Sequence, residues 1–530
     1  MERRGILQVV PAAALLAACG PAPSGRGPDG TGAQPAGKPV RGGTFTVAMA
    51  RDATNFDPTR QSDVYSAMVM NNTVDTLFEV DKEGNVVGRL VEKSENPQPN
   101  VYVFTLRKGI KFHDGTDLNA EAVKFNLQRH IDDPKSVRNQ DVKDITAIET
   151  PDPSTVRITL KAPYVPFPVK LTFGAGYILS PAAVQRLGES LQRDLTGAGS
   201  GAFKFVEWRK DTSVTLERNP TYWKKDGSEQ LPYLDRLVFK PFPDENVRLT
   251  NVKTGDADAL AGNPPDKDVA ELRRSADIDV KEIPGIGWSF ICMNTSQEPF
   301  TTAAARRAFS YAIDREQIRK TVFFDNGKAL DSPIPETIPW AYLKDASDHP
   351  YLKRDVAKAR QELAAAGKAS GFKFTFQISN ASPQLQQTAE LIKDQIKEVG
   401  LDMEIQLIEF ATVVANGQSG NFQALGLGWS GDVDPDTLAS LFLTGAGFNF
   451  AKYSTPEMDK LLNDGRQTVD RNKRADIYKQ AQKLLFQDQP FIVYYNPPQI
   501  STTRKNVQNY PQTYNGYWGS RDYDRVWKTQ

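Results

Sequence analysis

Residues 422–442 read FQALGLGWSGDVDPDTLASLF, in which a polar loop separates two apolar runs. The run at 422–427 has the length and composition of a short buried strand, and the run at 436–442 has those of the start of a helix. In open α/β sheets, ligands bind in the crevice beyond the carboxyl ends of the strands. The sequence therefore predicts an α/β fold in which the loop at 428–435 holds a ligand.

The side chains of this loop suit a small ligand that carries a charge. Trp429 offers a flat apolar wall, and Gly431 lets the backbone, including that of Ser430, approach a ligand closely. Asp432 adds a negative charge and has no evident local role. Asp434 precedes a proline, which is typical of a helix start, so we expect Asp434 to cap the following helix.

Composition restricts the class of protein. A chain of 530 residues exceeds what one ordinary core supports, so two or three domains are expected. Lys and Arg total 65, as do Asp and Glu, so no basic excess is present to neutralise the phosphates of a nucleic acid. Three histidines and two distant cysteines, Cys19 and Cys292, offer no clustered metal ligands. We expect no metal, no cofactor and no nucleic-acid partner.

The first 19 residues have the pattern of a bacterial lipoprotein signal peptide. Two arginines precede an apolar stretch that is too short to span a membrane. The sequence LAACG at 16–20 resembles a lipobox, in which cleavage leaves a lipid on Cys19. Residues 20–41 are rich in Gly, Pro, Ala and Ser and predict a flexible tether. We therefore expect a lipid-anchored protein on the outer face of the cell membrane, and the choice between Sec and Tat export stays open.

The rest of the pattern predicts two lobes and an inserted domain. Apolar residues alternate at 372–378 and 401–407 as in strands, and the segment between them has helical periodicity. This order predicts a parallel pair with a right-handed crossover. An apolar run at 491–495 is expected to cross back to the first lobe. The predicted domains are a discontinuous first lobe (42–80, 201–287 and 488–530), an inserted smaller α+β domain (81–200) and a second lobe (288–487).

Several motifs, in order along the chain, resemble the bacterial extracellular solute-binding proteins of family 5, the peptide/nickel class. They are FTLRKGIKFHDG at 104–115, ERNPTYW at 217–223 and RRAFSYAIDR at 306–315. The resemblance implies a type II periplasmic-binding-protein fold with two lobes, a hinge between them and an extra inserted domain. It also implies a monomeric binding component, not an enzyme, that delivers its solute to the permease subunits of an ABC importer.

The resemblance further implies where a ligand binds. In peptide binders of this family, the aspartate that matches Asp432 is associated with the ligand's ammonium group. Asp63 and Tyr65, at the start of a first-lobe helix, are expected as opposing contacts, and Asn449 as a weaker one. Dipeptide binders are expected to hold the peptide carboxylate with an arginine, but residues 382–387 (SPQLQQ) contain none. An amide does not replace a bidentate guanidinium, so we expect peptides of three or more residues to bind better than dipeptides.

Other functions stay open on the sequence alone. Relatives in this family carry glutathione, chelated nickel and sugar derivatives. A receptor that serves a sensor or chaperone partner would have the same sequence features. A glycoside hydrolase would use Asp432 and Asp434 as a carboxylate pair, which such enzymes hold about 5–5.5 or 6.5–9.5 Å apart.

Overall fold

The computed structural model describes residues 37–512 and 522–529. Val40–Gln530 forms one compact unit. The predicted signal peptide, Cys19 and most of the tether lie outside the described residues, and residues 37–41 are exposed and carry no helix or strand. Within the described residues, no helix is both long and apolar enough to cross a membrane.

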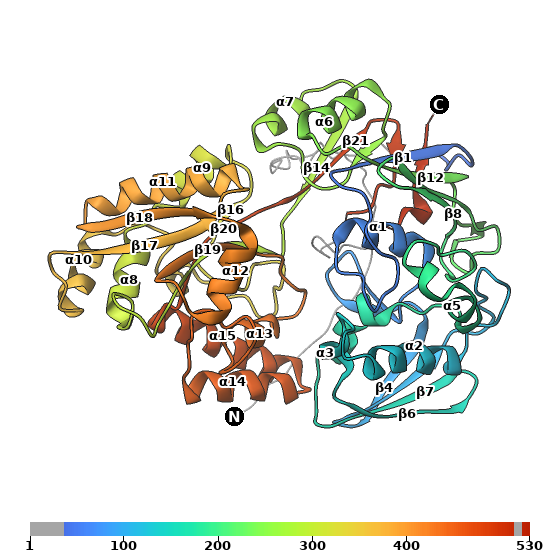
Figure 1. Cartoon of the computed structure of the whole chain (residues 1–530), viewed down its shortest axis with the longest axis horizontal. Coiled ribbons are helices and arrows are strands. Elements are labelled where there is room, and N and C mark those ends of the chain that lie inside the picture. Colours follow the sequence, from blue (N-terminus) through green and yellow to red (C-terminus); the bar gives the residue numbers. More distant parts are fainter. Residues whose placement is uncertain (1–36, 513–521, 530) are drawn as a thin grey trace, which may run out of the picture. The chain divides into compact units, whose positions relative to one another are not determined.

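A seven-stranded mixed sheet forms the centre of the first lobe (Figure 1). In it, β1 lies between β12 and β13 and runs parallel to both. Phe45, Val47 and Met49 of β1 are fully buried, as expected for a central strand. The strands, in spatial order, are β14 (Ile278–Ile283), β21 (Gln499–Arg504), β13 (Ala259–Leu260), β1 (Thr44–Met49), β12 (Arg236–Pro241), β9 (Ser213–Arg218) and β8 (Phe203–Arg209).

A four-stranded antiparallel sheet forms the inserted domain. Helix α2 (Ala120–Asp132) packs against two of its strands and begins at Asn119, whose side chain accepts a hydrogen bond from the Ala122 backbone N–H at 3.0 Å. This N-cap satisfies one of the unpaired amides of the first helical turn. The strands, in spatial order, are β4 (Val91–Gln98), β5 (Val101–Leu106), β7 (Thr155–Leu160) and β6 (Ile145–Asp152).

A six-stranded sheet forms the second lobe and confirms the predicted β-α-β unit. Strands β17 (Phe372–Ser379) and β18 (Leu401–Ile408) are parallel neighbours, joined through α11 (Pro383–Lys397). Strand β19 (Ala424–Trp429) runs parallel to β17 on its other side and ends at the candidate ligand loop. The other strands of this sheet are β15 (Trp288–Met293), β16 (Lys328–Ala329) and β20 (Phe491–Asn496).

The return of the chain to the first lobe occurs later than the sequence predicts. Strand β20 (Phe491–Asn496) belongs to the second sheet, where it pairs with β15 and β16 and is buried throughout. The next strand, β21, belongs to the first sheet. The predictions that the first-lobe segment starts at 488 and that the apolar run at 491–495 crosses back are therefore wrong. The crossing falls at Pro497 and Pro498, which lack the N–H groups needed to continue a ladder.

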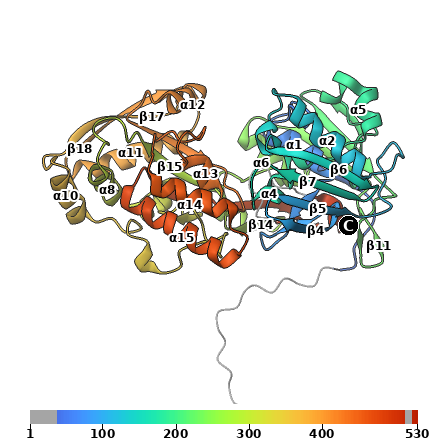
Figure 2. The ribbon, with the colours of Figure 1, turned by 90° about the horizontal axis from the view of Figure 1, so that it is seen from below.

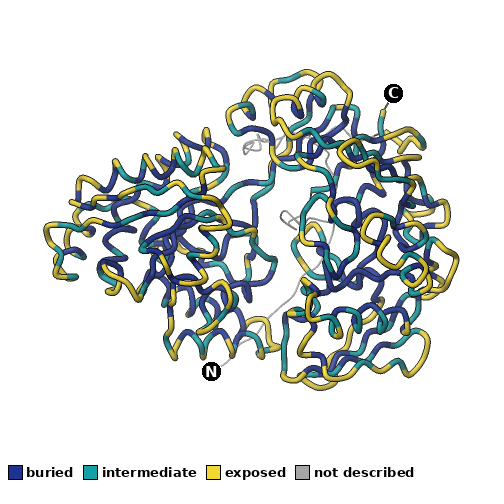
Figure 3. Tube along the Cα trace, in the orientation of Figure 1, coloured by how far each residue is buried: buried dark blue, intermediate teal, exposed yellow. Residues whose placement is uncertain are grey.

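Hydrophobic clusters follow the three sheets. Figure 3 shows buried stretches in the interior of the trace and exposed stretches mainly along its outside. Cys292 of β15 is a fully buried free thiol. In Figure 2, α13, α14 and α15 lie together beside the second sheet. The remaining helices are α1 (Val64–Thr73), α3 (Asn139–Val142), α4 (Phe167–Lys170), α5 (Pro181–Leu187), α6 (Glu245–Thr254), α7 (Val269–Leu272), α8 (Ala303–Tyr311), α9 (Arg315–Val322), α10 (Val356–Ala365), α12 (Phe410–Ser419), α13 (Thr437–Phe442), α14 (Pro456–Gln467) and α15 (Arg471–Asp488). The remaining strands are β2 (Phe78–Val80), β3 (Val86–Gly88), β10 (Lys225–Asp226), β11 (Glu229–Gln230), β22 (Val507–Gln508) and β23 (Trp527–Lys528).

Candidate functional site

The loop after β19 is held against a crossing between the two lobes. Gly431 has φ +80°, and a Cβ at this position would lie 2.1 Å from the carbonyl oxygen of Ile286. Only glycine tolerates both the left-handed conformation and this close approach. Residues 285–287 connect β14 of the first sheet to β15 of the second. The glycine therefore places the loop where the chain passes from one lobe to the other.

A cavity of about 150 Å³ lies beside this loop and is lined by both lobes. Three of the predicted site residues, Tyr65, Trp429 and Ser430, line it. Most of its lining side chains are apolar, as is usual for small-molecule sites. The lining residues come from α1, from the turn after β13, from the two segments that cross between the lobes, from the start of β21 and from the end of β19: Val64, Tyr65, Met68, Ala261, Gly262, Asn263, Gly285, Ile286, Gly287, Trp429, Ser430, Pro497, Pro498 and Gln499.

The indole of Trp429 is fixed as one wall of this cavity. Its Nε1 donates a hydrogen bond to Thr437 Oγ1 at 2.8 Å. Its ring packs against Trp288 with centroids 6.4 Å apart and meets Phe448 nearly perpendicularly at 5.3 Å. Since the polar N–H is satisfied and the ring is held on two sides, Trp429 presents a rigid apolar surface.

Asp432 lies two residues after Ser430, beyond the residues that line the cavity, and its side chain faces the inserted domain. Its Oδ1 accepts a hydrogen bond from the Val433 backbone N–H at 2.8 Å. Its Oδ2 lies 3.9 Å from Nζ of Lys170, and the Asp432 side chain is 30% exposed. Burial raises the pKa of Asp432 to about 6, against the lowering effect of the Lys170 ammonium.

Asp434 does not cap the next helix, so that expectation is wrong. Helix α13 begins at Thr437, and Asp434 instead receives two hydrogen bonds from the guanidinium of Arg474, at 2.6 and 2.7 Å. Its Oδ1 also accepts the backbone N–H of Asp436 at 2.8 Å. Both charged side chains of the pair are largely buried. The bidentate pair ties the loop to α15 and uses the hydrogen-bonding capacity of the Asp434 carboxylate.

Asp436 joins the second lobe to the inserted domain. Its Oδ1 accepts a hydrogen bond from Arg466 Nε at 2.8 Å, and its Oδ2 accepts one from the Tyr164 hydroxyl at 3.1 Å. The backbone N–H of Val165 donates to the Arg466 carbonyl at 2.8 Å. Burial raises the pKa of Asp436. These contacts fix the inserted domain against the end of the second lobe that carries the loop.

The structure does not bring Asp63 and Asn449 to the cavity wall. Asp63 caps α1 by accepting hydrogen bonds from the backbone N–H groups of Tyr65 and Ser66. Asn449 is buried, and its amide donates to the carbonyls of Leu443 and Tyr453. Both side chains support loops next to the site, and a ligand contact by either one stays a prediction.

Sequence reasoning missed Lys170 and the crossing segments. Lys170 lies in a short helix of the inserted domain, and no pattern in the residues around it indicates that it pairs with Asp432, which is far away in the sequence. The pair of glycines around Ile286 could have signalled a close backbone approach, because glycines next to a strand often mark one.

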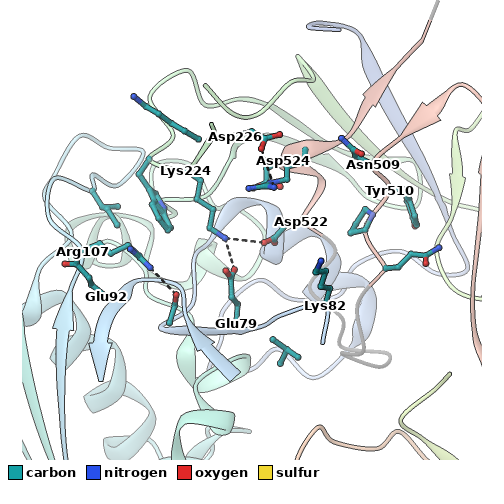
Figure 4. Close-up of a pocket in the computed structure, with 18 of the residues that line it drawn as sticks. Glu79, Lys82, Glu92, Arg107, Lys224, Asp226, Asn509, Tyr510, Asp522 and Asp524 are labelled. Atoms are coloured by element: carbon teal, nitrogen blue, oxygen red, sulfur yellow. Dashed lines mark hydrogen bonds and ion pairs between the residues drawn. The ribbon is translucent and has the colours of Figure 1, made fainter. Parts of the chain in front are cut away.

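A second, larger cavity of about 1190 Å³ is polar and belongs to the first lobe and inserted domain (Figure 4). Beside it, Arg89 forms buried ion pairs with Asp75, at 2.6 Å, and with Asp522. Lys224 Nζ lies 2.7 Å from Glu79, and Figure 4 shows it directed at Glu79 and Asp522. Because these charges largely satisfy one another, the network is a structural connection between the two parts.

Comparison with known proteins gives the family. The profile of the bacterial extracellular solute-binding proteins, family 5, matches residues 85–450, which is more than half of the chain. The chain belongs to this family. It therefore has the type II periplasmic-binding-protein fold and serves as the solute-binding component of an ABC importer, as the sequence motifs imply.

Individual family 5 proteins resemble the chain over nearly their whole length. The glutathione-binding protein GsiB of Shigella dysenteriae serotype 1 is 30% identical over 478 residues, covering 88% of this chain and 91% of the relative. The structure of DppA from Helicobacter pylori in complex with peptide STSA matches with a TM-score of 0.77 at 25% identity, covering 93% of this chain and 99% of the other. AppA from Bacillus subtilis, in complex with a nonapeptide, matches with a TM-score of 0.76 at 25% identity, covering 93% and 100%.

Proposed function

We propose that this protein binds a short peptide, or a similar amine-bearing solute, in the cavity beside Trp429 and Asp432 and presents it to the permease subunits of its importer. One observation carries the proposal: Trp429 and Ser430 line a cavity shared by both lobes, and the Asp432 carboxylate lies two residues further along the same loop, partly exposed. Apolar walls with a few fixed polar groups are the usual construction of a ligand site.

Each predicted site residue has a role in this proposal. Trp429 and Tyr65 bury the apolar part of the ligand, and the backbone at Ser430 approaches it closely. The Asp432 carboxylate accepts hydrogen bonds from the ligand's ammonium, which makes a charge-assisted contact stronger than a neutral one. Asp63 and Asn449 act as supports that hold α1 and the loop before Tyr453 in place.

The ligand classes of the relatives agree with an amine-bearing solute. The GsiB relatives are named for glutathione, and the solved DppA and AppA complexes hold peptides. Glutathione is therefore the second candidate ligand for this chain. Sugar derivatives have less support, because the cavity is mostly apolar.

Peptide length tests the proposed ligand class. Since residues 382–387 supply no arginine for a dipeptide's carboxylate, peptides of three to five residues are expected to bind roughly tenfold tighter than dipeptides of the same composition, because each further side chain buries apolar surface. Competition against a fluorescent tripeptide, supported by mass spectrometry of whatever co-purifies, measures this order. A series in which dipeptides bind tightest would contradict the proposal.

Anchoring is a separate part of the proposal. Cys19 carries the lipid, residues 20–41 form the tether, and the receptor works as a monomer at the membrane's outer face. Cys19→Ala is expected to move the protein from the membrane fraction to the soluble fraction, because it removes the thiol that carries the lipid anchor. Cys292→Ala is the matched control, since Cys292 is a buried free thiol in the folded part of the chain. Equal membrane retention of the wild type and Cys19→Ala in fractionation would reject the anchor.

A further inference from the structure

Lys170 of the inserted domain and Asp432 of the second lobe face each other with unused hydrogen-bonding capacity. Lys170 Nζ and Asp432 Oδ2 are 3.9 Å apart, which is longer than a hydrogen bond. Among the described residues, the Lys170 ammonium donates no hydrogen bond and Oδ2 of Asp432 accepts none. The two side chains are 28% and 30% exposed, so both can be reached from solvent.

The neighbouring charges at this junction are already paired. Asp434 is bound by Arg474 through two hydrogen bonds, and Asp436 is bound by Arg466 and Tyr164. None of these hydrogen bonds to Asp434 and Asp436 involves Lys170 or Asp432. The junction therefore leaves one ammonium and one carboxylate oxygen, on opposite sides, available to a third group.

The Lys170 ammonium keeps its charge at this position. Burial lowers the pKa of Lys170, but the carboxylates of Asp432 and Asp141 more than offset this, so that the pKa is raised. Asp141 lies in α3 of the same inserted domain. The separation of Lys170 from Asp432 is set by other contacts, since Tyr164 and Val165 bind Asp436 and Arg466 nearby.

We propose that Lys170 binds a carboxylate of the ligand while Asp432 binds its ammonium, so that the protein selects ligands with an α-amino-acid head group. This inference rests on the proposed function. In such a head group the ammonium and carboxylate share one carbon, which suits two side-chain ends only 3.9 Å apart. The two termini of an extended tripeptide are roughly 7–10 Å apart and cannot reach both groups together.

Two isomeric tripeptides separate this inference from general peptide binding. In γ-Glu-Ala-Gly the α-carbon of the glutamate carries both a free ammonium and a free carboxylate. α-Glu-Ala-Gly has the same composition and net charge, but its α-carboxyl group forms the peptide bond and its free carboxylate lies at the end of the side chain. By isothermal titration calorimetry, the wild type is expected to bind the γ-isomer roughly ten- to hundredfold tighter, the usual effect of one hydrogen-bonded charge contact. Lys170→Met is expected to remove this preference, and Lys170→Arg to retain most of it.

Lys368→Met is the matched control for the loss of a lysine. Lys368 is 25% exposed and pairs with Glu298 inside the second lobe, away from the junction, so the preference for the γ-isomer should persist. Equal affinity of the two isomers for the wild type, or an unchanged preference in Lys170→Met, would overturn the role of Lys170. The proposed function would survive that result if peptide binding still depended on Asp432. Failure of both isomers to bind would also overturn the inference.

Discussion

Asp432→Asn is expected to lower the affinity for an amine-bearing ligand roughly ten- to hundredfold. The substitution keeps the shape of the side chain but removes the negative charge, and a hydrogen bond to a charged group contributes about 1.5–3 kcal/mol. Asp432 is partly exposed, which argues against a larger loss. Isothermal titration calorimetry with a tripeptide of free amino terminus measures the change. Asp464→Asn is the control, because that carboxylate pairs with Lys460 on the surface of α14.

The same carboxylate makes binding depend on pH. Burial raises the pKa of Asp432 to about 6 in the ligand-free protein, and only the ionised form pairs with an ammonium. Bound ligand stabilises the ionised form, so the pKa falls on binding. Affinity should therefore be constant above about pH 7 and fall toward tenfold per pH unit below about pH 6. Asp432→Asn should lack this dependence. Unchanged affinity in the variant, or the same pH profile in both proteins, would remove Asp432 from the site.

Arg474→Met is expected to destabilise the protein by about 3–5 kcal/mol, because it leaves the Asp434 carboxylate without its buried partner. Arg474 is 5% exposed and Asp434 12%. The guanidinium also donates to the Gly465 carbonyl at 2.8 Å, so that a backbone acceptor is left unpaired as well. Urea unfolding of the wild type and the variant gives the difference in free energy of unfolding.

Two further variants show whether the buried pair causes this loss. Asp434→Asn combined with Arg474→Met should lose less stability than the sum of the two single changes, because neither charge is then left alone. Arg307→Met removes a more exposed pair with Glu362, 27% and 20% exposed, and should cost about 1 kcal/mol or less. A loss below about 1 kcal/mol in Arg474→Met would show that the pair does not hold the loop.

The sequence predicted the elements that depend on local patterns. Alternating apolar residues located β17 and β18, and helical periodicity located α11 between them. These features are set by residues within a few positions of one another. The candidate ligand loop was proposed for the same reason, because Trp429 and Gly431 lie at and just beyond the end of a buried strand.

Features that depend on distant partners could not be predicted. Asp434 has the local signature of a helix cap, but Arg474 on α15 is a stronger partner than the free amides of α13. The run at 491–495 is apolar enough for either lobe, and only its pairing with β15 assigns it to the second sheet. Lys170 has no local signal at all. In each case tertiary contacts decide between locally equivalent possibilities.

A crystal structure of the protein with a bound amine-bearing tripeptide tests the central claim most directly. Electron density for the ligand is expected between the lobes, with an apolar part against Trp429 and its ammonium nitrogen about 2.7–3.2 Å from Oδ2 of Asp432. A ligand bound elsewhere, with Asp432 directed into solvent and the cavity beside Trp429 closed by protein side chains, would contradict it.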